Sequence, residues 1–152
     1  VLAEAPDSFE ALRLRGDILL DNLDDWKAAA ADYDRAAALN PDSAATLVKR
    51  GQAYVKGARY DGAVKDFTAA ILMSPENDGA VAGLGGARML RGEYKEALEQ
   101  YERASGLAPK NGEYYFMAGN ACRKLKRLKS ANNYFKKACD LGFKTACGFI
   151  KK

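Results

Sequence analysis

Cysteine and histidine decide which side-chain chemistry this chain of 152 residues could carry, and it has three cysteines and no histidine. Without histidine, Ser/His/Asp and Cys/His catalysis and histidine metal sites are excluded. Cys122, Cys139 and Cys147 are too few thiolates for a four-cysteine zinc site. We therefore expect neither an enzyme nor a bound metal or cofactor.

Two of the cysteines, Cys139 and Cys147, are spaced for a disulfide. We expect Cys139 near the end of one helix and Cys147 on a short closing helix, 144–151, with a sharp reversal at Gly142. Such a turn brings two cysteines within the Cα separation of about 4.4–6.8 Å that a disulfide requires. The alternative is a pair of buried free thiols. The disulfide is the favoured prediction, and it would indicate an exported or periplasmic protein. Cys122 is expected in the core.

The net charge of +4 is unevenly distributed along the chain. Residues 1–121 hold 14 Lys and Arg against 19 Asp and Glu, whereas residues 122–152 hold 10 cations against Asp140 alone. One interpretation is a solvated end of the molecule, and the other is a docking surface for an acidic partner, a nucleic acid or a membrane surface. The docking surface would use seven of these ten cations, which we call the basic segment: Arg123, Lys124, Lys126, Arg127, Lys129, Lys136 and Lys137. Few aromatic residues are interleaved with them, so nucleic acid is the less favoured partner.

The elements that position these residues follow from a spacing of 34 residues. Small and aromatic residues recur with this period in three sets: Ala29, Ala63, Ala97 and Ala131; Tyr33, Phe67, Tyr101 and Phe135; and Ala36, Ala70, Ala104 and Ala138. A fixed period of this length is typical of a helical repeat array. No apolar run approaches the roughly 20 residues that a membrane-spanning helix needs.

Each period is expected to form two helices joined by a tight turn. In the second period the helices are Ala44–Val55 and Tyr60–Met73, with Gly57 supplying a flexible backbone between them and Pro75 following the pair. Glycines midway along the first helices should allow close approach of the second helices; these are Gly16, Gly51, Gly85 and Gly119. The recurring aromatic residues should fill the core between the helices. Trp26, Tyr60, Tyr94 and Leu128 should open the second helices.

The pattern resembles the tetratricopeptide repeat (TPR) family. The matching positions within one repeat are Gly51, Tyr54, Tyr60, Ala63, Phe67, Ala70 and Pro75. The resemblance implies an all-α fold, an α-α superhelix (TPR solenoid) of four helix-turn-helix repeats with a short C-terminal capping helix. The implied organisation is one domain over 1–152, with repeats at 9–43, 44–77, 78–111 and 112–145. The segment around Cys139 and Cys147 is similar to cysteine-rich TPR-like relatives in which such a pair bridges adjacent helices.

The pattern breaks at both ends of the array. The first repeat has one extra residue near its turn, since Gly16 and Gly51 are 35 residues apart. Residues 1–8 look like the tail of a preceding helix, which would leave an apolar flank at Ala11, Leu14 and Ile18. Self-association through this uncovered end is one expectation, and cover by an N-terminal arm is the other.

The resemblance also implies a binding surface, because the first helices of TPR relatives line a concave groove. The groove positions here are Arg13, Asp17, Leu20, Val48, Gln52, Val55, Ala82, Gly86, Met89, Phe116, Asn120 and Arg123. We expect an ion pair between Arg13 and Asp17, and we expect Gly79, Gly83 and Gly86 either to leave room for a ligand or to be a tolerated weakness of their helix. The predicted function is a non-catalytic scaffold that binds a peptide or helix of a partner protein. The alternative is binding of an acidic partner or a nucleic acid through the basic C-terminal repeat.

Overall fold

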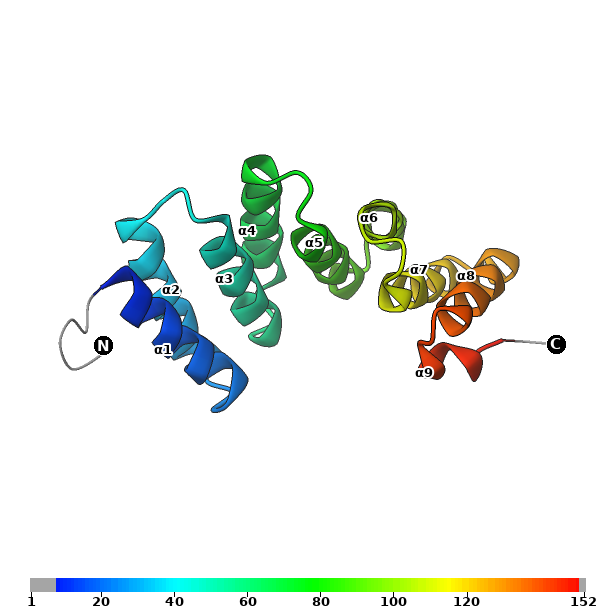
Figure 1. The fold of residues 1–152 in the computed structure, drawn as a ribbon, viewed down its shortest axis with the longest axis horizontal. Helices are drawn as coiled ribbons and strands as arrows, with labels where there is room; N and C mark the ends of the chain where they lie inside the picture. Colours follow the sequence, from blue (N-terminus) through cyan, green and yellow to red (C-terminus); the bar gives the residue numbers. More distant parts are fainter. Residues whose placement is uncertain (1–7, 151–152) are drawn as a thin grey trace. The chain divides into compact units, whose positions relative to one another are not determined.

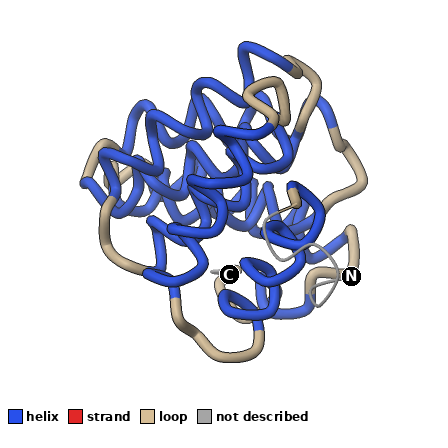
Figure 2. The backbone as a smooth tube through the Cα atoms, turned by 90° about the vertical axis from the view of Figure 1, so that its left-hand side faces the viewer, coloured by secondary structure: helices blue, strands red, loops and turns tan. Residues whose placement is uncertain are grey.

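The computed structural model describes residues 8–150, and within them it contains helices and no strand (Figures 1 and 2). The helices form two compact units, Val1–Pro75 and Glu76–Lys152. The first unit holds α1 (Phe9–Asp21), α2 (Trp26–Leu39), α3 (Ala44–Lys56) and α4 (Tyr60–Met73). The second holds α5 (Asp78–Arg91), α6 (Tyr94–Leu107), α7 (Gly112–Lys124), α8 (Leu128–Asp140) and α9 (Lys144–Cys147). The expected four helix pairs and capping helix are confirmed. None of the described helices has the length and hydropathy to cross a membrane.

Polar residues in front of the first helices cap their free amide groups. Ser8 accepts a hydrogen bond from the Ala11 amide at 3.1 Å, and Ser43 and Asn77 cap α3 and α5 in the same way. A side-chain oxygen at this position satisfies a backbone N–H that the helix itself cannot pair. Since these caps lie just after the breaks between repeats, they fix where each new pair begins.

The turn inside each pair closes on a left-handed residue. Positive φ angles of 53°, 54°, 82° and 60° occur at Asp24, Ala58, Gly92 and Lys126, which are spaced by 34 residues. The residue after each of them donates its amide to a carbonyl near the end of the first helix, as Arg59 does to Tyr54 at 2.8 Å. This arrangement satisfies the last carbonyls of the helix. In the first turn Asp25 reaches back to Leu19, one residue further than in the other three turns, so the extra residue is accommodated there.

The expectation that Gly57 supplies the flexible backbone of the second turn is wrong. Its φ is −83°, an ordinary value, and the left-handed residue is Ala58. Gly57 is needed for space instead, because a Cβ at this position would lie 2.5 Å from the Trp26 ring. Trp26 therefore packs over the turn of the following pair.

A glycine packs against an aromatic ring in all four pairs, which agrees with the expected close approach of the second helices at these glycines. A Cβ at Gly16 would lie 2.7 Å from Tyr33, and one at Gly119 would lie 2.5 Å from Phe135; Gly51 and Gly85 meet Phe67 and Tyr101 in the same way. The four rings are 0–3% exposed. Because a methyl group would not fit, the glycines set the distance between paired helices.

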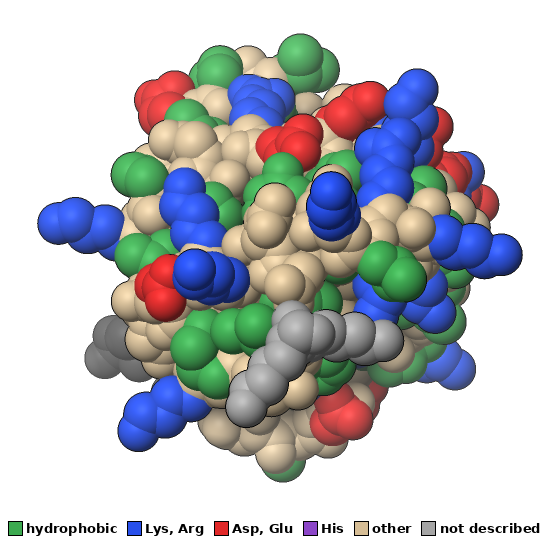
Figure 3. All heavy atoms as spheres, turned by 90° about the vertical axis from the view of Figure 1, so that its right-hand side faces the viewer, with side chains coloured by type: hydrophobic (Ala, Val, Ile, Leu, Met, Phe, Trp, Pro, Cys, Tyr) green, Lys and Arg blue, Asp and Glu red, His purple; other side chains and the backbone are tan. Residues whose placement is uncertain are grey.

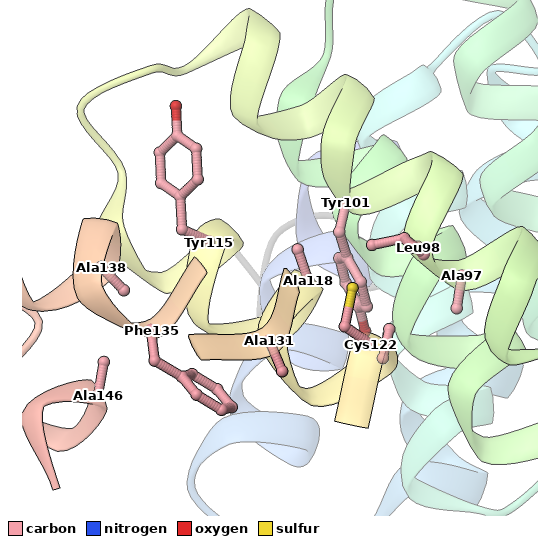
Figure 4. Close-up of a cluster of buried hydrophobic side chains, with 11 residues drawn as sticks. Ala97, Leu98, Tyr101, Tyr115, Ala118, Cys122, Ala131, Phe135, Ala138 and Ala146 are labelled. Carbon is pink, nitrogen blue, oxygen red and sulfur yellow. The ribbon is translucent and has the colours of Figure 1, made fainter. Parts of the chain in front are cut away.

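The capping helix closes the core of the second unit. Cys122, Ala131 and Phe135 converge in this core (Figure 4), and Ala146 of α9 is fully buried against it. Helix α9 ends at Cys147 and is shorter than the expected 144–151. The Cys139–Cys147 disulfide joins α8 to α9 with Cα atoms 5.0 Å apart, within the predicted range. Gly142 has a φ of 88°, which agrees with its predicted role in the reversal.

Candidate functional site

The groove positions of the first unit lie on α1 and α3. Gln52 is exposed, whereas Arg13, Asp17, Val48 and Val55 are half-buried, so all five are accessible. Leu20 is 1% exposed and belongs to the core beside Tyr33, so it is not available to a ligand. The accessible face of α3 therefore presents two aliphatic side chains with an amide between them.

Asp17 is the most strongly engaged of these positions. Its carboxylate accepts a hydrogen bond from the Tyr33 hydroxyl at 2.7 Å and pairs with Lys49 Nζ at 3.3 Å. The expected ion pair with Arg13 is wrong, because the Arg13 guanidinium lies over the Phe9 ring, 5.5 Å from its centroid. Burial, followed by the hydrogen bond to Asp17, raises the pKa of Tyr33. Tyr33 thus holds Asp17 in place from the core side.

Two Arg–Asp pairs brace the helices of the first unit. Arg15 of α1 pairs with Asp32 of α2, and Arg50 of α3 pairs with Asp66 of α4 through two hydrogen bonds of 2.7 and 2.6 Å. Arg50 also pairs with Asp34 at 2.8 Å, which ties α3 to the preceding helix pair. Both Asp32 and Asp66 are 4% exposed. Bidentate pairs of this kind fix geometry as well as contributing energy.

Sequence reasoning missed these pairs, although a signal was present. Arg15 and Arg50 are 35 residues apart and Asp32 and Asp66 are 34 apart, so both partners follow the repeat. The later repeats carry apolar or neutral residues there: Leu84 with Gln100, and Ala118 with Tyr134. The pairs are therefore a property of the first unit.

The groove positions of the second unit lie on α5 and α7. Arg123 is exposed, while Ala82, Gly86, Met89, Phe116 and Asn120 are half-buried. At Gly86 a Cβ would meet only the Tyr101 hydroxyl, at 3.7 Å, so packing does not require a glycine there. Gly85, one residue earlier, is crowded by the Tyr101 ring at 2.8 Å. Packing therefore explains the glycine at Gly85 and not the one at Gly86.

Phe116 belongs to an aromatic cluster rather than standing free on the groove face. Its ring centroid lies 5.1 Å from Phe143, 5.4 Å from Phe149 and 5.6 Å from Phe135. Arg123 lies over the Phe149 ring of this cluster, with its guanidinium carbon 5.2 Å from the ring centroid. Residues after α9 therefore pack against the groove face of α7.

An apolar hollow of about 420 Å³ lies beside α8 in the second unit. Its walls include Leu128, Ala131, Phe135, Phe149 and Ile150, and Arg123 and Lys129 stand at its rim. We call this surface the end hollow. Apart from Arg123, none of these residues belongs to the groove positions.

The described residues contain no group of three His, Cys, Asp or Glu side chains that could hold a metal ion. Cys122 is buried, as expected, and burial raises the pKa of its thiol. A buried thiol with a raised pKa is a poor nucleophile, because the thiolate is the reactive form.

The apolar flank expected at the N-terminal end is partly wrong. Ala11 is fully buried, since it packs inward from α1, whereas Leu14 and Ile18 are 49% and 40% exposed. The expected helical tail at 1–8 lies outside the described residues, except for Ser8, which caps α1. Self-association through this end stays a prediction.

Comparison with known proteins gives a consistent result. The family model described as tetratricopeptide repeat matches residues 1–44, 48–111 and 91–142. A structure entitled "Crystal structure of MamA" is 25% identical with a TM-score of 0.85, covering 95% of this chain and 84% of that chain. The MamA chain from residue 41 of Desulfovibrio magneticus RS-1 is 22% identical with a TM-score of 0.85, covering 94% of this chain and 80% of that one. The Arabidopsis OM64 TPR domain is 25% identical with a TM-score of 0.72, covering 76% of this chain and 94% of the domain. The curated proteins include no match.

Proposed function

Because the chain belongs to the tetratricopeptide repeat family, we propose that it is a non-catalytic scaffold that binds a peptide or helix of a partner protein on the first helices of its repeats. The TPR fold and the MamA-like structures support a protein–protein interaction scaffold. The proposal also specifies the face on which the ligand binds. It rests on α3, where Gln52 is exposed and Val48 and Val55 are half-buried on the same face of the helix. The buried residues of this helix are Thr46, Leu47, Gly51 and Ala53.

The chemistry of this face suits a peptide backbone flanked by apolar side chains. The Gln52 amide can both donate to and accept from a peptide bond. Val48 and Val55 lie one turn to either side and offer apolar contacts. In the second unit Asn120 and Met89 offer the same pair of chemistries. A peptide whose backbone bonds the side-chain amide while its apolar side chains contact the aliphatic residues would use both of these chemistries.

The rigidity of the face also supports the proposal. Arg50 anchors α3 to α4 through Asp66 and to α2 through Asp34, and Lys56 Nζ donates to the Leu20 carbonyl at 2.7 Å. These contacts hold α3 from the sides that face neighbouring helices. A surface that is ordered before binding loses less conformational entropy when a ligand arrives.

The proposal is tested by selecting peptides from a displayed library on the full chain and measuring their affinity for variants. Val48→Glu should weaken a selected peptide by about tenfold or more, because the ligand would bury an unpaired carboxylate. Thr68→Glu introduces the same side chain at an exposed position on α4 and should leave affinity unchanged. Circular dichroism checks that both variants keep their helices.

Equal loss in the two variants, or no loss in Val48→Glu, would contradict binding on the first helices. Phe116→Ala is a poor test of groove binding, since Phe116 packs against three other rings and its loss would disturb the core.

A further inference from the structure

The end hollow joins an apolar interior to a charged rim. Leu128 is 59% exposed and Phe149 is 36% exposed, so its walls are open to solvent. Arg123 and Lys129 are exposed at its edge, and no carboxylate is among the described residues that line it. An accessible hollow of this size could accept a large aliphatic or aromatic side chain.

The cations near the end hollow are not neutralised by the protein. Within residues 8–150, none of the seven cations of the basic segment, Arg123 to Lys137, forms an ion pair. In the first unit, by contrast, Arg15, Lys49 and Arg50 are each paired with an aspartate. Lys and Arg side chains stand out from the face shown in Figure 3, with hydrophobic surface and some Asp and Glu side chains between them. The unpaired positive charge favours a negatively charged partner.

The aromatic residues of the end hollow do not suit a nucleic acid. Single-stranded nucleic acids stack their bases on open aromatic faces. Phe149 is covered by the Arg123 guanidinium at 5.2 Å, by Phe135 at 5.3 Å and by Phe116 at 5.4 Å. Since the Arg123 guanidinium already lies over the Phe149 ring and the residue is only 36% exposed, the hollow favours an inserted side chain over a stacked base.

We propose that the end hollow binds an acidic peptide segment of a partner protein, with a large apolar side chain of the peptide in the hollow and its carboxylates against Arg123, Lys129 and the neighbouring lysines. This site is distinct from the groove positions, because α8 and residues 148–150 supply all of it except Arg123. Binding at the end hollow can therefore be tested independently of peptide binding on α1, α3, α5 and α7.

Calorimetric titration of the full, oxidised chain tests the proposal. The probe is the unlabelled, end-blocked peptide Glu-Asp-Glu-Leu-Phe-Glu-Asp-Glu, and its control carries Gly-Ser in place of Leu-Phe. We expect saturable binding of the probe and weaker binding of the control peptide. Lys129→Glu should weaken the probe by about tenfold, since it reverses a charge at the rim. Lys95→Glu, at an exposed position on α6, makes the same charge change elsewhere and should have little effect.

A second variant blocks the hollow without touching its charges. Gly148 has a φ of −70°, and a Cβ there would lie 3.7 Å from its nearest neighbour, so the backbone accepts a side chain. Gly148→Trp should abolish probe binding and leave the circular dichroism spectrum unchanged.

Three results with the unaltered chain would overturn the proposal. The first is no binding of the probe at low salt, and the second is equal binding of the Gly-Ser peptide, which would indicate a merely electrostatic surface. The third is tighter binding of single-stranded oligothymidylate than of the probe, which would indicate a nucleic-acid surface. Full binding by Gly148→Trp would likewise place the peptide elsewhere. Val48→Glu separates the two proposals, because it should weaken groove ligands and leave this probe unaffected.

Discussion

Asp66 shows how one buried carboxylate supports the candidate binding helix. It is 4% exposed and accepts two hydrogen bonds from Arg50, the residue that holds α3 against α4. These hydrogen bonds are the largest cause of the raised pKa of Arg50. The guanidinium is therefore a permanent charge, and its partner cannot be removed without leaving that charge partly unpaired.

We predict that Asp66→Asn lowers the free energy of unfolding by about 2–3 kcal/mol, because a hydrogen-bonded buried charge loses its counter-ion. Asp34→Asn removes the other partner of Arg50, but its side chain is 55% exposed, so the expected loss is below about 1 kcal/mol. Urea denaturation of both variants measures the difference. Equal losses of unfolding free energy would show that burial of Asp66 does not strengthen its ion pair with Arg50.

Within α5, two adjacent glycines have different physical reasons to be small. A Cβ at Gly85 would lie 2.8 Å from the buried Tyr101 ring, whereas one at Gly86 would find its nearest neighbour at 3.7 Å. Both lie in the interior of the same helix, where alanine is intrinsically preferred. They form a matched pair in which only packing differs.

Gly85→Ala should therefore destabilise the protein by about 1–3 kcal/mol through overpacking. Gly86→Ala should stabilise it by up to about 1 kcal/mol through helix propensity. Thermal unfolding should shift in opposite directions for the two variants. A shift in the same direction would mean that Tyr101 does not set the spacing of α5 and α6.

The short helix α9 depends on its covalent link to α8. Only four residues long, α9 is too short to be stable by itself, and it contributes the buried Ala146. The disulfide closes a segment with a sequence separation of 8. In the chain-entropy model a loop of this length contributes about 2–3 kcal/mol.

The variant with Cys139→Ala and Cys147→Ala should lose about 2 kcal/mol of unfolding free energy. A reductant should lower the stability of the unmodified chain by a similar amount and leave the variant unchanged. Denaturation curves measured with and without dithiothreitol provide both comparisons. A reductant effect that persists in the variant would assign the stabilisation to something other than this disulfide.

Across the whole molecule, the sequence predicts what the period of 34 controls. It predicted the bounds of α4, Tyr60–Met73, and the close approach of the paired helices at Gly16, Gly51, Gly85 and Gly119, because these positions recur in every pair. It did not predict the space that Gly57 leaves for Trp26, since Trp26 is a three-dimensional neighbour outside the local pattern. The left-handed position does follow the period, but its residue type differs at Asp24, Ala58, Gly92 and Lys126, so the pattern of residue types did not identify it.

The candidate site was harder to predict for the same reason. The period identifies which first-helix residues share a face, and it cannot reveal what else contacts them. Asp17 turned out to pair with Lys49 from the next helix pair, and Phe116 to pack against Phe149, which follows the last repeat. The end hollow depends on residues 148–150, where the repeat has ended.

Binding of a peptide ligand on the first helices can be tested most directly by NMR on the full chain. A library-selected peptide is titrated into ¹⁵N-labelled protein while the backbone amide shifts are followed. The largest changes are expected at Val48, Gln52 and Val55 of α3 or at Met89 and Asn120 of α5 and α7. Changes confined to the second helices α2, α4 and α6 would contradict binding on the first helices.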